Sequence, residues 1–279
     1  MLPTLLVLGV FLVGPILGAI ALAFYKVQLL GEVSYHFVGL KNFIRMLEDE
    51  SVSIALQNTL KYVITVVPIQ TILALGLVLL LNTKIQGKNW FKIIFFMPTV
   101  TSSAILTLIF MWMYNTNGLL NAVLQFLGWP TYNWLGDPNV ALKGIMMMNI
   151  WATAPLFMVI YLAALQEVPK SLYEAAEMDG ATPWDKFWHI TLPFLRPVTF
   201  FIVVMGVIGA FQLFDQAYIF SGGSGGPDNA TLTLVLLIYQ YAFKTLDIGY
   251  ALALTLLLAI VILSATLIQR TLFKEERLD

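Results

Sequence analysis

The chain has 279 residues, of which 59% are hydrophobic and 11% are charged, and its formal net charge is −1. Soluble domains are about 45–50% apolar and about 25% charged, so a soluble globule and a disordered chain are both excluded. A net charge near zero also gives no basic surface for nucleic acid. With no cysteine and two distant histidines, neither a disulfide framework nor a cysteine or histidine metal site is expected. The composition therefore predicts an integral membrane protein.

Six apolar stretches are each long enough for one helical span, which needs about 20 residues. Backbone polar groups in lipid must be satisfied within the segment, and the alternation of a barrel strand is missing, so each stretch is predicted to be a helix. In chain order the predicted spans are residues 2–25, 62–81, 93–114, 144–165, 198–220 and 248–268. The prediction is an all-α polytopic membrane protein in which residues 1–279 form a single transmembrane domain.

The first and the shortest apolar stretches need separate interpretation. Residues 2–25 are longer than the apolar region of a signal peptide and follow no charged segment, so we expect a retained anchor. Residues 232–243 are apolar but too short to span. We expect this run to lie near the outer surface or to pack against the bundle.

The basic residues predict the orientation of the spans. Lys26, directly after the first span, favours an outer N-terminus, but nine of the 15 Lys and Arg residues lie on the opposite side of the spans. Because basic residues accumulate in cytoplasmic loops, both termini are predicted to be cytoplasmic. The nine residues are Lys84, Lys88, Lys92, Lys170, Lys186, Arg196, Arg270, Lys274 and Arg277.

No G-x-x-x-x-G-K-S/T phosphate-binding motif occurs in the chain. The chain is therefore not expected to bind ATP in that way. The energy for any transport must come from a partner or from a gradient.

The polar segment between spans four and five, residues 167–197, has internal order. Ser171 and Glu174 have the spacing of a capping box, so a short helix is predicted to begin at Ser171. Gly180 is positioned to end that helix.

A second short helix is predicted directly after the glycine. Thr182, followed by Pro183 and Asp185, has the pattern of a helix start with proline in the first position. Pro193 and Pro197 are predicted to break the chain before span five. The result would be two short helices at the membrane surface.

This segment resembles the EAA loop of ABC importer permeases, in which EAA, two residues and DGA precede a Phe, an Ile and a Leu-Pro. The resemblance implies a cytoplasmic helix pair that docks into a groove of a partner ATPase and couples its movement to the spans. The residues themselves leave open that Glu174 only caps its own helix. The matching positions are Glu174, Ala175, Ala176, Asp179, Gly180, Ala181, Phe187, Ile190, Leu192 and Pro193.

The resemblance covers nearly the whole chain, because residues 37–43, 150–169, 214–243 and 249–255 are similar to carbohydrate-importer permeases. It implies a second homologous permease subunit, two copies of an ABC ATPase, which bind the ATP and Mg, and an extracytoplasmic solute-binding protein. The substrate would be an oligosaccharide, a glycosyl-polyol or a glycerol phosphate ester. The chain itself would have no cofactor and catalyse no reaction, in the inner membrane of a bacterium or archaeon.

Polar residues in the fourth and fifth spans are candidates for the substrate pathway, because polar groups within lipid tend to face a cavity. Amides and carboxylates can bind sugar hydroxyls, and an aromatic ring can cover the apolar face of a sugar ring. Trp151 could instead be a packing or interfacial aromatic residue, and Asp215 could lie at the water interface or cap a helix. The candidates are Asn149, Trp151, Gln212, Asp215 and Gln216.

Two other functional classes fit the composition less well. A gradient-driven secondary transporter usually has several intramembrane ionisable residues and an internal repeat, whereas Asp215 is the one charged residue within the predicted spans. An intramembrane enzyme needs a nucleophile and a base, and neither histidine lies in a predicted span.

Overall fold

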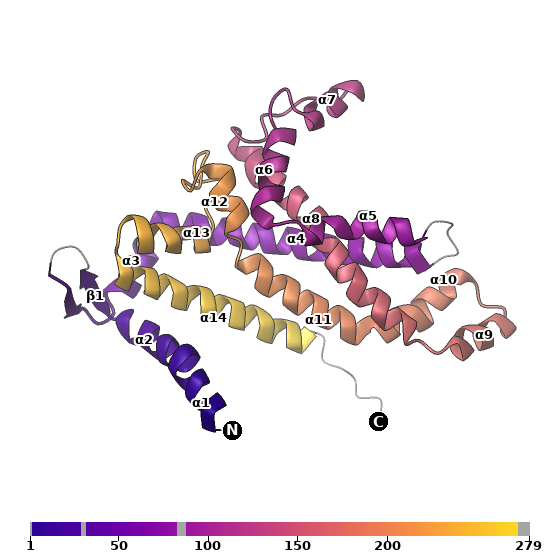
Figure 1. Cartoon of the computed structure of the whole chain (residues 1–279), viewed down its shortest axis with the longest axis horizontal. Helices are drawn as coiled ribbons and strands as arrows, with labels where there is room; N and C mark the ends of the chain where they lie inside the picture. Colours follow the sequence, from indigo (N-terminus) through magenta and orange to yellow (C-terminus); the bar gives the residue numbers. More distant parts are fainter. Residues whose placement is uncertain (1, 29–31, 83–87, 273–279) are drawn as a thin grey trace.

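The computed structural model describes residues 2–28, 32–82 and 88–272 (Figure 1). Lys84, Lys274 and Arg277, which contribute to the predicted orientation, lie outside the described residues, as do the side chains of Lys88 and Lys92. Within the described part the chain is built of helices and one antiparallel hairpin, in which β1 (Tyr25–Gln28) pairs with β2 (Ser34–Phe37). The predicted all-α fold class is confirmed.

Five helices of the described chain are long and apolar enough to cross a membrane, or six if one bent pair is a single span, in agreement with the six predicted. The segments that form these spans are α1 (Leu2–Leu8), η1 (Gly9–Val13) and α2 (Gly14–Leu22), then α4 (Glu50–Asn82), α5 (Lys88–Val100) with α6 (Ser103–Met113), α8 (Pro138–Gln166), α10 (Pro183–Lys186) with η2 (Phe187–Thr191), α11 (Leu192–Phe211) and α12 (Asp215–Ser221), and α14 (Ile248–Leu272). The shorter helices are α3 (Lys41–Glu48), α7 (Leu119–Phe126), α9 (Lys170–Met178), α13 (Leu234–Tyr239) and η3 (Gln240–Lys244).

The third span is bent sharply. The axes of α5 and α6 meet at 109° across the two residues Thr101 and Ser102 (Figure 1). The backbone of Ser102 is extended, with ψ of 135°, which ends the helical hydrogen-bond ladder there. The straight helix predicted for residues 93–114 is therefore wrong.

The fifth span is broken near its end, where residues 198–220 were predicted to form one helix. α11 ends at Phe211 and α12 begins at Asp215. The interruption frees backbone groups, and the carbonyl of Leu213 is satisfied by the Thr233 hydroxyl at 2.9 Å. Irregular backbone at membrane depth is tolerated where it is buried in protein or lines a cavity, and this segment does both.

Pro193 and Pro197 do not break the chain before the fifth span, contrary to the prediction. The helix runs on from α10 through η2 into α11. η2 is a π-helical turn in which the backbone N–H of Leu192 donates to the carbonyl of Phe187, five residues back. This change of hydrogen-bond register leaves Pro193 in the first turn of α11, where its missing N–H is not required.

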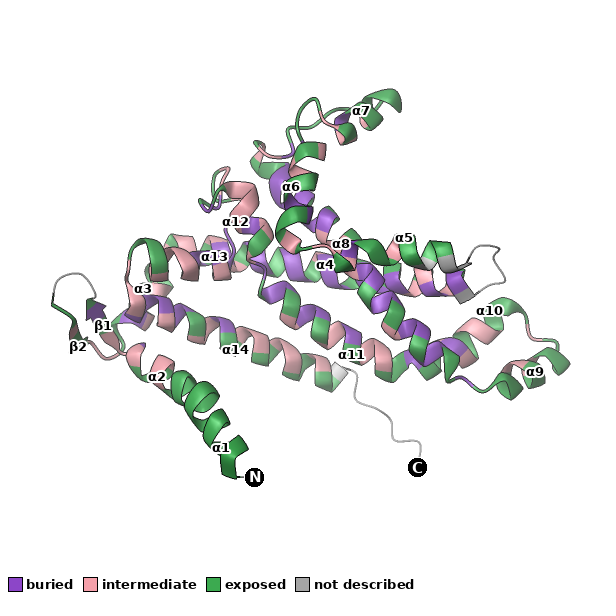
Figure 2. Cartoon of the chain, in the orientation of Figure 1, coloured by how far each residue is buried: buried purple, intermediate pink, exposed green. Residues whose placement is uncertain are grey.

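The core of the bundle lies where α4, α8, α11 and α14 meet. It is built from buried apolar side chains of all four helices, such as Val66, Ile145, Val207 and Leu254 (Figure 2). α13 contributes Leu234, Leu236 and Leu237 to the same cluster. The apolar run of residues 232–243 therefore packs against the bundle.

The N-terminal apolar segment, from α1 to α2, projects away from the helix bundle (Figure 1). α1, η1 and α2 contain no buried residue, and apolar side chains such as Phe11, 77% exposed, surround the helix (Figure 2). We call the segment from α1 to α2 the N-terminal arm. Its contact with the bundle is at its α2 end, next to the start of α14 (Figure 1).

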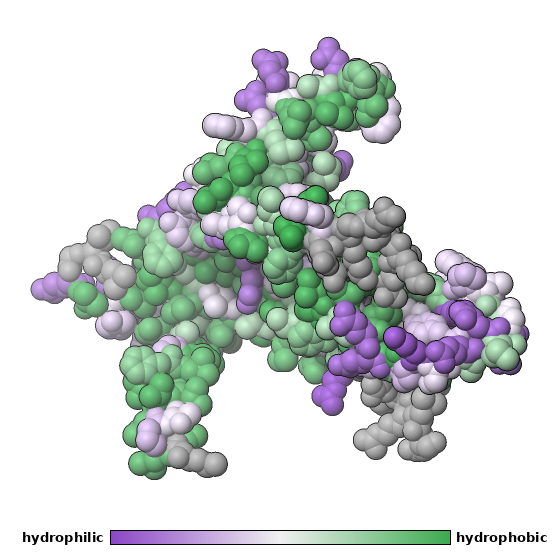
Figure 3. Space-filling model, turned by 45° about the vertical axis from the view of Figure 1, so that its right-hand side comes forward, coloured by the Kyte–Doolittle hydropathy of each residue, from purple (hydrophilic) through white to green (hydrophobic). Residues whose placement is uncertain are grey.

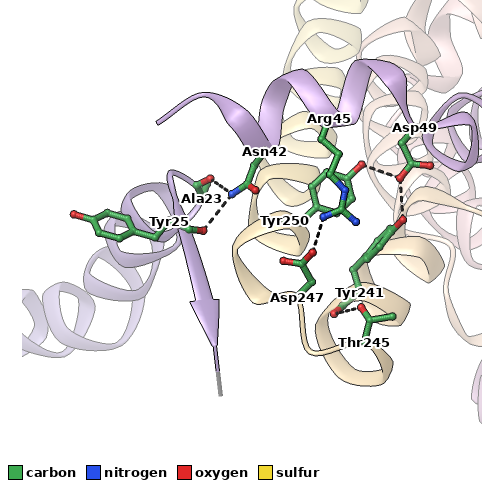
Figure 4. A network of polar contacts seen from close by, with 9 residues as sticks. All are labelled: Ala23, Tyr25, Asn42, Arg45, Asp49, Tyr241, Thr245, Asp247 and Tyr250. Atoms are coloured by element: carbon green, nitrogen blue, oxygen red, sulfur yellow. Dashed lines mark hydrogen bonds and ion pairs between the residues drawn. The ribbon is translucent and has the colours of Figure 1, made fainter. Parts of the chain in front are cut away.

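A polar network joins α3, η3 and the start of α14 at the base of the arm (Figure 4). Arg45 forms an ion pair with Asp247 at 2.6 Å, and its guanidinium lies 3.9 Å from the centre of the Tyr250 ring. The Asp49 carboxylate accepts hydrogen bonds from the hydroxyls of Tyr241 and Tyr250, at 2.8 and 2.9 Å. Each of these charged groups and hydroxyls therefore has an ion-pair or hydrogen-bond partner within the network.

The same region fixes the end of the arm. The buried amide of Asn42 donates to the carbonyls of Ala23 and Tyr25 (Figure 4). A side chain at Gly249 would collide with the Tyr25 carbonyl, so glycine lets the backbone of β1 cross the start of α14. The arm is therefore attached at a defined point.

Candidate functional site

A polar cavity of about 280 Å³ lies among α4, α8 and α11 and the segment that joins α11 to α12. Its size is near the lower end of ligand pockets, which are roughly 300–1,000 Å³. Apolar side chains, including Val66, Phe157 and Met205, form part of the wall. The polar residues that line it are Tyr62, Gln70, Asn149, Thr153, Gln212, Asp215 and Gln216.

Four of the five predicted pathway residues meet in this cavity. Asn149 comes from α8, and the interrupted fifth span brings Gln212, Asp215 and Gln216 to the same wall. The amide of Gln216 also donates to the Ser103 hydroxyl at 2.9 Å, which links α12 to α6. The break between α11 and α12 thus positions the polar side chains. Their contact with substrate stays a prediction.

Gln70, on α4, forms a buried part of the cavity wall and is only 3% exposed. Its Oε1 lies 2.6 Å from the hydroxyl of Thr153, and within the described chain its Nε2 has no hydrogen-bond partner. A side chain at Gly206 would place its Cβ 2.7 Å from that Nε2. Glycine at this position therefore leaves space for the amide beside the cavity.

The Thr153 hydroxyl has two acceptors within reach and a single proton. It lies 2.7 Å from the Asn149 carbonyl and 2.6 Å from Gln70 Oε1. When it donates to Asn149, its own oxygen is free to accept from the Gln70 amide turned the other way. Gln70 can therefore offer the cavity either a donor or an acceptor.

Trp151 does not line the polar cavity. It lies beside a second, apolar cavity of about 540 Å³ at the elbow between α5 and α6, which Met97, Pro98 and Phe110 also line. The rings of Trp151 and Phe110 are 5.5 Å apart. Residues two positions apart on a helix point to nearly opposite sides, which separates Trp151 from Asn149.

The segment predicted to couple to an ATPase contains two short helices. α9 begins at Lys170 with Pro169 at the N-cap position, and no side chain caps it. The predicted capping box of Ser171 and Glu174 is therefore wrong, because the N-cap position lies two residues before Ser171. Glu174 is exposed on α9.

The turn between the two helices follows the prediction. Gly180 has φ of +75°, a left-handed conformation that favours glycine. The Thr182 hydroxyl accepts from the backbone N–H of Asp185, whose carboxylate accepts from the Thr182 N–H, so a capping box begins α10. Local sequence therefore fixes the angle of this turn.

An ion pair joins the two short helices. Lys186 Nζ lies 2.6 Å from a Glu177 carboxylate oxygen. The hydrogen bond from Lys186, together with its charge, lowers the pKa of Glu177. The Glu177 side chain is 68% exposed, so we expect little stability from this pair alone.

The surface of this segment differs from that of the spans. Glu174, Ala175, Asp179 and Pro193 are exposed, whereas Ala176, Ala181, Phe187, Ile190 and Leu192 are half-buried. Figure 3 shows hydrophilic residues gathered at the α9–α10 end of the molecule and apolar residues along the bundle. A water-facing end of this kind is accessible to a soluble partner.

Residues 62–277 match the family described as binding-protein-dependent transport system inner membrane component. The chain belongs to this family. It is 35% identical to the lactose transport system permease protein LacF of Rhizobium radiobacter, over 95% of this chain and 89% of that protein. It is 34% identical to the trehalose/maltose transport system permease protein MalF of Thermococcus litoralis, over 96% of this chain and 90% of that protein.

The fold is also that of solved transporters. A crystal structure of a bacterial alginate ABC transporter in complex with alginate pentasaccharide-bound periplasmic protein matches with a TM-score of 0.81. The match covers 98% of this permease and 92% of that chain, at 22% identity. The multi-pass membrane architecture is therefore that of ABC importer permeases.

Sequence reasoning missed part of the permease cavity. Tyr62 and Gln70 line it from α4, yet neither was a candidate. A signal was present, because Gln70 is the one amide within residues 62–81.

Among the described residues, no group of three His, Asp or Glu side chains is placed to hold a metal ion.

Proposed function

We propose that this permease subunit carries a carbohydrate or glycoside through the inner membrane in an ATP-driven, binding-protein-dependent importer. The observation that carries the proposal is the polar cavity inside an apolar bundle. Buried polar groups cost free energy unless they serve an interaction, and amides with a carboxylate suit sugar hydroxyls. The names of the relatives support the substrate class, since those proteins transport lactose and trehalose or maltose.

In this proposal α9 and α10 dock on a cytoplasmic ABC ATPase, which binds the ATP and Mg. The exposed Glu174, Ala175 and Asp179 support docking, because they offer acceptors beside a small side chain that permits close approach. Both termini then face the cytoplasm. The helix from α10 through η2 to α11 connects the docking segment to the cavity.

We further propose a second, homologous permease subunit as the partner within the membrane. The apolar cavity at the α5–α6 elbow and the apolar surface of the N-terminal arm support this. Neither surface is covered within the described chain. In the assembly, two ATPase copies would lie on one side and a solute-binding protein on the other.

Substitutions in the cavity test the proposed pathway. Gln212→Ala and Asn149→Ala should reduce uptake of labelled lactose, trehalose or maltose by the reconstituted importer while leaving subunit assembly intact. Asn139→Ala, at the exposed start of α8, is the matched control outside the cavity. Unchanged uptake by both cavity variants would contradict the pathway.

A further inference from the structure

The described residues that line the polar cavity carry charge of one sign only. Asp215 is the one charged side chain among the described residues that line it, and no Lys, Arg or His is among them. The remaining polar groups are amides and hydroxyls. Any solute in this cavity therefore meets a negative charge and neutral hydrogen-bonding groups.

The charge of Asp215 is not neutralised nearby. Its side chain makes no ion pair or hydrogen bond within the described residues. The nearest elements, α12 and the segment that follows α11, contribute Gln212 and Gln216 rather than a cation. Asp215 is exposed where it lines the cavity. Like charges a few ångströms apart near a protein surface repel each other, although less than in a dry interior, so a second negative charge beside Asp215 would be repelled.

The wall at Gln70 suits a hydroxyl group. Gln70 can present a donor or an acceptor, because the single proton of Thr153 serves one of two acceptors. A sugar hydroxyl is itself both donor and acceptor, so it satisfies either arrangement. A carboxylate, sulfonate or phosphate oxygen accepts only, and it gains nothing from Asp215.

We propose that this cavity selects uncharged, polyhydroxylated solutes and rejects anionic ones, with Asp215 as the residue that discriminates. The proposal rests on the proposed function and narrows its substrate class, since it excludes glycerol phosphate esters and acidic sugars. Similarity to known permeases does not by itself determine whether the substrate is neutral or anionic. The two relatives described above are named for neutral sugars. Another relative, 32% identical, is named for sulfoquinovosyl glycerol, which carries a sulfonate, and the solved transporter of the same fold is named for alginate, an acidic polysaccharide.

Matched sugar pairs test the discrimination. Lactitol and lactobionate share a galactosyl group and an open six-carbon chain but differ by a terminal hydroxymethyl or carboxylate, and maltitol and maltobionate differ in the same way. Saturation-transfer difference NMR on the complete importer in nanodiscs, without its binding protein, detects weak binding of each. We expect each anion to bind about tenfold or more weakly than its neutral partner, as for like charges in one cavity.

Variants assign this difference to one side chain. In Asp215→Asn, the affinities for the two members of each pair should differ by less than about threefold, because the substitution removes the repulsion while the side chain keeps its shape. Asp228→Asn is the control, because it removes an exposed carboxylate outside the cavity.

Three results would overturn the proposal: equal binding of both members by the wild type, an unchanged difference in Asp215→Asn, or no binding of any neutral sugar. The proposed function fails separately, if the reconstituted importer transports no carbohydrate.

Discussion

Glu174 projects from α9 without capping it, which sharpens the test of its role. Glu174→Gln keeps the length of the side chain and removes its charge. The isolated chain should lose less than about 0.5 kcal/mol of stability, as for other exposed substitutions. If the carboxylate pairs with a basic residue in a dry ATPase interface, docking should weaken by about 2–5 kcal/mol.

Substrate-stimulated ATPase activity of the reconstituted importer measures that loss. Glu167→Gln, an exposed carboxylate just before α9, is the matched control and should retain stimulation. Full stimulation with Glu174→Gln would remove the docking role from this residue.

Gly180 tests whether the angle between α9 and α10 matters. Its φ of +75° disfavours any residue with a Cβ, and a left-handed residue costs roughly 1–2 kcal/mol. Gly180→Val should therefore misalign the two helices and reduce co-purification of the ATPase, while membrane insertion is unchanged. Gly222→Val imposes the same strain at φ of +60° beyond α12 and should leave co-purification unchanged. Equal effects of the two variants would contradict a specific role for the α9–α10 turn.

Local chemistry explains which residue-scale predictions held. Gly180 and the Thr182–Asp185 capping box act within a few residues, so the sequence alone predicts them. The Ser171–Glu174 box has the same pattern, but Pro169 is the N-cap residue, two positions before Ser171, so Ser171 lies inside the helix. Gln70 lines the cavity only because α4 packs against α8 and α11, and that packing is not visible in one span.

At the scale of elements, the network beneath the N-terminal arm depends on Asp49. Partial burial raises its pKa, but the hydrogen bonds donated by Tyr241 and Tyr250 outweigh this effect and lower it. A carboxylate with a lowered pKa stabilises the folded state above its unfolded pKa of about 3.9, and this stability is lost as the pH falls through the folded value. Asp49→Asn should therefore lower the thermal midpoint at neutral pH.

Thermal midpoints measured from pH 8 to pH 3 test this linkage. The difference between wild type and Asp49→Asn should stay constant down to about pH 4 and shrink below it. Glu48→Gln, a neighbouring exposed carboxylate, should show a much smaller difference at every pH. A difference that grows as the pH falls would contradict the account.

Hydropathy predicts where spans lie but not where they bend. Thr101, Ser102 and Gln212 are polar but uncharged and lie between long apolar runs, so hydropathy averaged over a whole span does not reveal the breaks. The break in the fifth span involves a tertiary contact, the hydrogen bond from the Thr233 hydroxyl to the Leu213 carbonyl. In contrast, proline is expected to break a helix, but the π-helical turn η2 allows the helix to continue through Pro193.

At the scale of the whole molecule, the span count and the family follow from sequence because they depend on composition and on a long motif. Helix periodicity also predicts that Trp151 and Asn149 point to nearly opposite sides of α8, but which of the two faces the polar cavity depends on the helices packed against each side. The uncovered arm likewise has no local signature, because an apolar helix has the same composition against lipid or protein.

This permease is proposed to move a carbohydrate across the membrane with energy from ATP. The most direct measurement is uptake of labelled lactose, trehalose and maltose by proteoliposomes that contain the chain, its partner permease, the ATPase and the binding protein. Uptake should require ATP with Mg on the ATPase side and should persist when a protonophore and a sodium ionophore dissipate all gradients. Uptake that needs a proton or sodium gradient and continues without the ATPase would contradict the account.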